Sequence, residues 1–566
     1  MDDLLDALAR LTARLENLER RVSALEHSSE TADSLPVQPI SPAVTDSAAP
    51  VDTLAQDSGV FPVVGKAMLG IAGAYLLRAV AESGSFPKLA VVALALAYAA
   101  MWLVWAARVS PDAQFASTAY AATSAFILAP MLWELTLVFK VLSTSVTASV
   151  LVAFVVAASA LAWKRNLASV TWVANATAAF TALALLLATH DLVPFITALL
   201  VIALVSESAA CRNHWLSLRP LVAVVADLAI CILAYIYSRP ESARSEYPAV
   251  ETRVLLALVS ILFLIYGASA AFRTIRLHQR ITVFEIGQTF IAFLLAVFSV
   301  LHFGPSGSAE VLGALCLLLS AGCYAAAFSS FDRIPQQRNY HVYGTWSAAL
   351  FLAGGFLCFS PLPLALCLSM AALVATFLGV RVARLTLEFH GLVYLSAAAF
   401  ASGLLDYAGR ALGGTFPTAP GWMVWIVAAS AILCYAIGAG FRGDRWNQRL
   451  LQLLSATLAV SAVATFLVSA LVWLAESGMT PAFHHVAVIR TLITCALALA
   501  LAFSGSRWQR IELVWIAYGT LALVTVKLLF EDLRHGHPGS IAISIFLYAV
   551  ALIILPRMTR LGRRRT

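Results

Sequence analysis

Polar and apolar positions divide the chain into a short polar arm and a long series of hydrophobic segments. Residues 1–60 are mostly charged or small and polar, whereas mostly apolar runs of 18 or more residues recur from Phe61 to Pro556. As helices, such runs are long enough to cross a hydrocarbon core of about 30 Å. Because that core offers no water to the backbone, spanning segments of this kind are helical. The pattern predicts an all-α, polytopic transmembrane bundle.

The hydrophobic runs predict about eighteen spans joined by short loops. Lys66, Gly70, Gly73 and Leu77 share one stripe of the first span, and this stripe predicts close packing inside the bundle. The predicted spans are 61–81, 88–107, 113–133, 141–163, 167–189, 191–210, 216–237, 251–272, 281–303, 308–329, 340–360, 361–380, 387–408, 421–440, 450–474, 482–503, 510–530 and 539–556.

Composition agrees with a membrane protein. Hydrophobic residues make up 61% and charged residues 12% of the 566 residues, and the mean hydropathy is +0.86. A soluble protein carries about 25% charged residues. The net charge of +7 comes from basic residues in short loops, where they set topology, so it does not indicate nucleic acid as a partner. The partner expected from composition is the lipid bilayer.

The polar arm has two parts. Residues 1–27 show an a/d heptad seam with opposite charges at the g and following e positions, which favours a parallel homo-oligomer. The alternative is an amphipathic helix on the membrane or on the protein itself. Residues 28–60 have the composition of a disordered linker before the transmembrane domain, 61–566. The seam residues are Leu4, Leu8, Leu11, Leu15, Leu18, Val22 and Leu25.

Loop charges predict orientation. Alternate loops carry most of the arginines, as at Arg212–Arg219 and Arg442–Arg449, and the C-terminal tail is also basic. Positively charged loops stay in the cytoplasm, so we expect a multi-pass protein of the bacterial cytoplasmic (inner) membrane with both termini inside.

A motif recurs along the chain at a four-span interval. Tyr98, Tyr324, Tyr435 and Tyr548 each precede alanine near the end of an even-numbered predicted span. Glu285, Glu388 and Glu512 each open a span shortly after an arginine. These correspondences predict that the bundle is built from four-span repeats.

The arm, the linker and the first span together resemble a known type of protein. The segment Gly65-Lys66…Ile71-Ala-Gly73…Leu76-Leu77-Arg78, with Phe86-Pro87 opening the next span, is similar to a family of uncharacterised bacterial polytopic membrane proteins of the "predicted membrane protein" type. The hairpin Lys527-Leu-Leu-Phe530-Glu-Asp532 resembles that family's C-terminal end. The resemblance implies architecture and brings no catalytic residues. Phe61 stands where the family pattern has tryptophan.

Charged and polar residues inside the spans are the candidates for chemistry, since each is costly in a bilayer. Asp227 lies deepest and is interpreted either as a proton- or cation-coupling carboxylate or as a hydrogen-bonded structural residue. Asn175 is expected to join two helices. Arg78 with Glu82 and Lys527 with Glu531 form predicted i,i+4 pairs. The remaining candidate is Lys66.

Enzymatic motifs do not appear in the sequence. It has no Walker motif, dinucleotide glycine loop, G-x-S-x-G or H-E-x-x-H, so we predict no catalytic residue and no cofactor. The histidines and cysteines follow no recognised metal-ligand spacing, and no metal site is predicted.

Three function classes remain open. The first is transport or lipid and solute handling through a polar midplane cavity at Asp227, with glycine pairs at Gly354–Gly355 and Gly413–Gly414 and a broken helix near Pro361 and Pro363. The second is a scaffold of the cell envelope that self-associates through the heptad seam. The third, ranked last, is a membrane enzyme acting on a lipid-linked substrate. Of these, the sequence favours transport or lipid handling.

Overall fold

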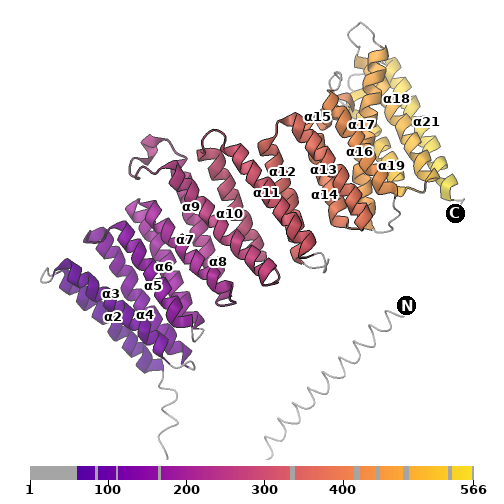
Figure 1. The fold of residues 1–566 in the computed structure, drawn as a ribbon. Helices are drawn as coiled ribbons and strands as arrows, with labels where there is room; N and C mark the ends of the chain where they lie inside the picture. The colour runs from indigo at the N-terminus through magenta and orange to yellow at the C-terminus, as the bar shows by residue number, and fades with distance from the viewer. Residues whose placement is uncertain are drawn as a thin grey trace, which may run out of the picture. The chain divides into compact units, whose positions relative to one another are not determined.

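A computed structural model describes residues 60–82, 87–109, 113–163, 167–331, 338–412, 421–440, 446–475, 483–532 and 538–563. The chain divides into two units, Met1–Val63 and Val64–Thr566. Predictions for the heptad seam and the linker lie outside the described residues, as does Gly413–Gly414. All elements in the described part are helical, which confirms the all-α prediction (Figure 1).

The helices follow one another with short connections. The first nine are α2 (Val60–Glu82), α3 (Lys88–Arg108), α4 (Gln114–Trp133), α5 (Thr144–Trp163), α6 (Ala168–Thr189), α7 (Leu192–Ala210), α8 (Arg219–Tyr237), α9 (Thr252–Ala271) and α10 (Val283–Phe303). The others are α11 (Ser308–Ser329), α12 (Arg338–Cys358), α13 (Pro361–Val382), α14 (Leu385–Ala401), α15 (Leu404–Leu412), α16 (Trp422–Gly440), α17 (Trp446–Ala475), α18 (Phe483–Arg507), α19 (Ile511–Lys527) and α21 (Pro538–Arg563).

Short irregular helices extend some of these elements. Three π-helical segments continue α4, α9 and α19. They are η3 (Glu134–Val138), η6 (Phe272–Arg276) and η7 (Leu528–Asp532), and each carries a charged residue that forms an ion pair. The 3₁₀ turns are η4 (Leu216–Leu218) and η5 (Glu241–Arg244).

Sixteen helices in the described residues are long and apolar enough to cross a membrane, by length and composition alone. Two of the eighteen predicted spans differ. The helix α12 at predicted span 340–360 is not among the sixteen, and its first turns contain Arg338, Asn339 and His341. Predicted span 387–408 is two helices, α14 and α15, bent by 69°.

The bend between α14 and α15 has a local cause. Gly403 adopts a φ of +75°, which glycine tolerates because it has no Cβ. The Ser402 hydroxyl accepts a hydrogen bond from the Leu404 N–H at 3.3 Å, and so starts the new helix. The sequence analysis placed the broken helix at Pro361 and Pro363, and that prediction is wrong: both prolines lie in the first turn of the regular helix α13.

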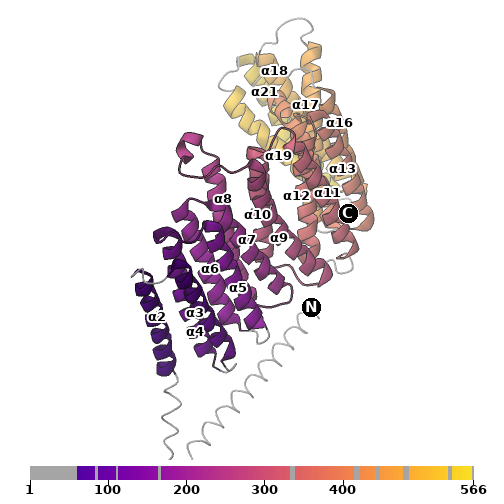
Figure 2. The same cartoon turned by 60° about the vertical axis from the view of Figure 1, so that its left-hand side comes forward.

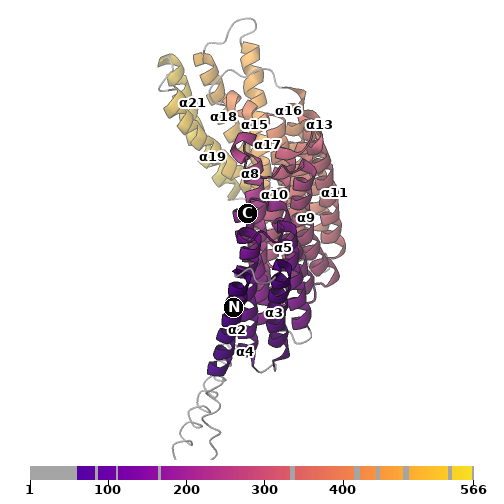
Figure 3. The same ribbon diagram turned by 90° about the vertical axis from the view of Figure 1, so that its left-hand side faces the viewer.

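Helices that lie close in the sequence pack against one another. The pairs α3 and α4, α7 and α8, α11 and α12, and α16 and α17 are in contact. So are α5 and α6, α9 and α10, α13 and α14, and α18 and α19, and also α4 and α6, α8 and α10, α12 and α14, and α17 and α19. Figure 2 shows α5, α6 and α7 side by side. Figure 3 shows α9 next to α10.

The best-packed part of the protein lies between α4 and α8. Nearly all of the largest fully buried side chains belong to residues 132–230, and Phe195, Leu199 and Ile230 are examples. Arg490 of α18 is the exception. Dense packing of aliphatic side chains makes this part a rigid core.

The first span corrects a sequence prediction. A Cβ on Gly70 would lie 2.5 Å from the Trp102 ring, so the glycine stripe does approach α3 closely. However, only 6% of the span's window is buried, and Met68, Leu69 and Leu76 are exposed. The prediction that this span packs inside the bundle is wrong, since α2 touches its neighbours with one stripe only.

Candidate functional site

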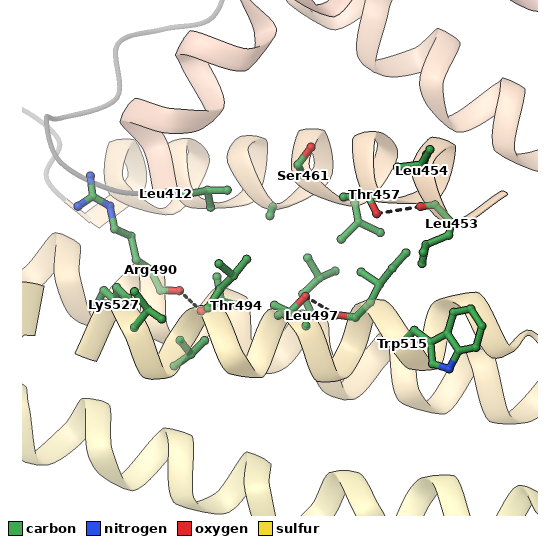
Figure 4. Close-up of a pocket in the computed structure, with 18 of the residues that line it drawn as sticks. Leu412, Leu453, Leu454, Thr457, Ser461, Arg490, Thr494, Leu497, Trp515 and Lys527 are labelled. Carbon is green, nitrogen blue, oxygen red and sulfur yellow. Dashed lines mark hydrogen bonds between the residues drawn. The ribbon is translucent and has the colours of Figure 1, made fainter. Parts of the chain in front are cut away.

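A large cavity lies between α17, α18 and α19 (Figure 4). Its volume is about 970 Å³, at the upper end of the range of roughly 300–1,000 Å³ that is typical of small-molecule sites. Figure 4 shows Arg490 and Lys527 at one end and Trp515 at the other. The apolar residues of its lining are Leu412, Leu453, Leu454, Val460, Ala464, Leu497, Trp515, Ile516, Leu523, Val524, Val526 and Phe530.

The wall of the cavity is apolar even where its residues carry hydroxyl groups. Thr457 donates to the Leu453 carbonyl at 2.8 Å, and Thr494 donates to the Arg490 carbonyl at 2.7 Å. Both hydroxyls are therefore satisfied within their own helices. Leu523 and Phe530 of the lining are 69% and 71% exposed, so the cavity opens onto the apolar surface of the bundle.

Arg490 joins the cavity to the bent pair of helices. Its side chain is 1% exposed, and it donates from Nε to the Ala411 carbonyl at 2.7 Å and from Nη2 to the Arg410 carbonyl at 3.0 Å. These carbonyls lie in the last turn of α15, where backbone acceptors need donors from outside the helix. A cation at a helix C-terminus also interacts favourably with the helix dipole. Arg490 thus holds the end of α15 against the cavity, where Leu412 is part of the lining.

Lys527 is the second basic residue at this end. Its ammonium donates to the Ala487 carbonyl at 2.6 Å, to the Thr491 hydroxyl at 2.7 Å and to both carboxylate oxygens of Asp532 at 2.7 and 2.9 Å. The π-helical η7 brings Asp532, five positions further on, to the ammonium. The predicted pairing with Glu531 concerns a side chain outside the described ones.

A buried charge cluster lies in another part of the bundle, where α7, α8, α9 and α10 meet. Arg219 donates to both oxygens of Glu207, at 2.8 and 2.7 Å, and to Glu285 at 2.9 Å. Arg273 approaches Glu285 at 2.7 Å and also donates to the Ala210 carbonyl. All four charged residues are 4% exposed or less, and two positive charges balance two negative ones.

Local structure explains how the charge cluster is held. Thr282 and Glu285 form a capping box at the start of α10, in which each side chain accepts from the other residue's backbone N–H. The Ser269 hydroxyl donates to Glu207 at 2.6 Å from α9. Bidentate pairing and these additional bonds satisfy most polar atoms of the cluster, as burial requires.

Asp227, the deepest candidate from the sequence, lies further along α8. It is 8% exposed and accepts a hydrogen bond from the Gln288 amide at 2.8 Å. Among the described residues it forms no ion pair. Asp227 does not line the cavity between α17, α18 and α19. The large cavity therefore lies in another part of the bundle than the cavity predicted at Asp227.

The other predicted residues are dispersed. Asn175 is 1% exposed, and its amide donates to the Thr171 carbonyl of its own helix at 2.8 Å. Lys66 is exposed on α2. Arg78 pairs with Glu134 of η3 at 2.6 Å, a contact between two helices. The side chain of its other predicted partner, Glu82, lies outside the described ones.

Of the residues that define the two polar regions, Lys527 and Glu285 stood out in the sequence, but Arg490 and Glu207 did not. Arg490 was hidden in a long apolar run, although a charge inside a span is itself a signal. Glu207 and Arg219 close and open adjacent spans, and their pairing depends on which helices meet.

The sixteen apolar helices define the chain as a polytopic helical membrane protein. No family model matches the chain, and neither a curated protein nor a solved structure matches it.

Proposed function

We propose that this protein handles a lipid, or another apolar solute of the bilayer, in the cavity between α17, α18 and α19. The observation that carries the proposal is the cavity itself, a space of about 970 Å³ with an apolar wall and a basic end. Its exposed lining residues adjoin the surface that hydrocarbon covers in a membrane. A molecule with acyl chains can therefore enter sideways without crossing water.

The bent helix pair supports a transport role for this cavity. Discontinuous helices next to a binding site are a common feature of membrane transporters, in which irregular backbone lines a cavity or is buried in protein. Here the end of α15 meets Arg490 at the cavity, and Gly403 is a candidate hinge. Movement of α15 about Gly403 would move Leu412 and change access to the cavity.

We also propose the orientation that the loop charges favour, with both termini in the cytoplasm of a bacterial inner membrane. In that orientation the charge cluster lies near the cytoplasmic side, and Arg490 and Lys527 lie near the outer side. Arginine-rich connections such as Arg212–Arg219 support this assignment.

A four-span repeat is proposed for the architecture. Its support is the recurrence of helix pairs and of tyrosine contacts. Tyr324 of α11 contacts His390 of α14 at 2.9 Å, and Tyr435 of α16 contacts Glu512 of α19 at 3.4 Å. α11 and α14 are three predicted spans apart in the sequence. α16 and α19 are also three spans apart, and each lies four spans after its counterpart. The cavity would then be a specialisation of one repeat.

Filling the cavity tests the proposed function. A Cβ built on Gly519 meets no atom within 4 Å, and Gly519 lines the cavity, so Gly519→Phe places a ring inside it without a clash at Cβ. We expect native mass spectrometry of the purified variant to show fewer retained lipids than wild type. Gly287→Phe is the matched control, because Gly287 also has open space at Cβ but lies on α10. Equal lipid retention in all three proteins would contradict the proposal.

A further inference from the structure

The ammonium of Lys527 lies where four oxygen atoms converge. They belong to the Ala487 carbonyl, the Thr491 hydroxyl and the Asp532 carboxylate, at 2.6 to 2.9 Å from Nζ. We call these four atoms the oxygen cage. Two helices and a π-helical segment supply the cage and the ammonium: α18 gives Ala487 and Thr491, α19 gives Lys527, and η7 gives Asp532. The arrangement depends on tertiary packing, which brings these elements together.

The chemistry of the cage is that of a site for a hard cation. Carboxylate, hydroxyl and carbonyl oxygens are the ligands that such cations take in proteins. Among the described side chains, Asp532 gives the cage its negative charge, and one such charge matches a monovalent ion. An ammonium group has three N–H donors and no acceptor, so it can neutralise and bind surrounding oxygen atoms much as a metal cation does.

Burial makes a cation necessary at this position. Ala487, Thr491 and Asp532 are 3%, 0% and 2% exposed. An ionised carboxylate in such surroundings is costly unless a positive charge accompanies it. The cage is therefore stable when it is filled, and the chain fills it with its own side chain.

We propose that the oxygen cage is a monovalent-cation site whose resident cation is the Lys527 ammonium. The stem of Lys527 lines the cavity, and its charged end completes the cage. Because the positive charge is built into the chain, this end of the cavity needs no sodium or potassium ion from solution. The inference goes beyond the proposed function, since it holds whichever solute enters the cavity.

Removal of the lysine head tests the proposal. Lys527→Ala leaves the cage and opens room for an ion of ammonium size. We expect its thermal unfolding midpoint in detergent to lie below wild type in choline chloride, and to rise saturably when KCl or ethylammonium chloride replaces choline at constant ionic strength. Wild type should show no such specific rise.

Two further variants keep the test decisive. Lys527→Met fills the space with an apolar stem and should not respond to potassium. Lys527→Ala with Asp532→Asn removes both charges and should fold without any salt response. If the double variant folds while Lys527→Ala stays unfolded in every salt, or if Lys527→Ala responds to KCl as wild type does, the cage is not a cation site. The readout needs no bound lipid, so its failure is separate from failure of the proposed function.

Discussion

Two regions of this protein bury charged side chains among apolar helices, and the central arginine of each, Arg219 or Arg490, has a different kind of partner. In the charge cluster of α7 to α10, arginines and glutamates form hydrogen bonds and ion pairs with one another. Arg219, for example, bonds both Glu207 and Glu285. Around the cavity of α17 to α19, Arg490 instead bonds two backbone carbonyls at the end of α15. The first arrangement joins neighbouring helices through side chains, and the second holds the end of a bent helix pair.

The difference shows how a membrane protein can be rigid in one part and hollow in another. Ion pairs between side chains form only where the helices lie close together. The charge cluster adjoins residues 132–230, where most of the largest fully buried side chains lie. Backbone carbonyls of an interrupted helix need a donor from elsewhere, and a long arginine can supply it across a gap. The second solution leaves room for a cavity, which the first does not.

The largest expected effect comes from breaking the charge cluster. Arg219→Met leaves Glu207 and Glu285 without their shared partner, and removal of one member of a buried ion pair costs about 3–5 kcal/mol. We expect this loss in the free energy of unfolding, measured in mild detergent with a chemical denaturant.

Two variants check the reason for that loss. Adding Glu207→Gln to Arg219→Met restores neutrality and should recover part of the stability. Arg276→Met removes an exposed arginine of η6 and should change stability by less than about 0.5 kcal/mol. If Arg219→Met is as stable as wild type, the cluster does not hold the four helices together.

A smaller effect is expected at the cavity. Arg490→Met leaves the Ala411 and Arg410 carbonyls without this donor, and unsatisfied buried polar groups cost about 1–3 kcal/mol each. The loss should be greatest for α15, so hydrogen exchange of residues 404–412 should rise more than that of α17. Arg507→Met, an exposed arginine in the last turn of the same helix, is the control. Unchanged exchange in α15 would show that Arg490 does not cap it.

The smallest expected effect on stability comes from replacing glycine, either at the bend or in the helix that follows it. Gly403 and Gly409 both have open space at Cβ, but only Gly403 has a positive φ. Gly403→Ala should cost about 1–2 kcal/mol because a Cβ is strained in the left-handed region. Gly409→Ala should be neutral or stabilise by up to about 1 kcal/mol, since alanine favours a helix. Equal effects at both positions, read from thermal unfolding, would argue against a fixed bend.

The sequence was sufficient for the architecture because hydrophobic run length directly reports a spanning helix. It also contained local signals for parts of the sites, such as the Thr282–Glu285 capping box. It did not reveal the Lys527–Asp532 pair, because five-residue spacing becomes a contact only in a π-helical turn. Nor did it reveal the partners of Arg490, which lie about eighty positions earlier in the chain and meet it only through tertiary packing.

The central claim is that a lipid occupies the cavity between α17, α18 and α19, and a density map of the purified protein in lipid nanodiscs tests it most directly. The account predicts elongated density beside Gly519 and Thr457 that no side chain explains, with density for Lys527 continuing into Asp532 at the basic end. A map in which α17, α18 and α19 close on one another and leave no space there would contradict it.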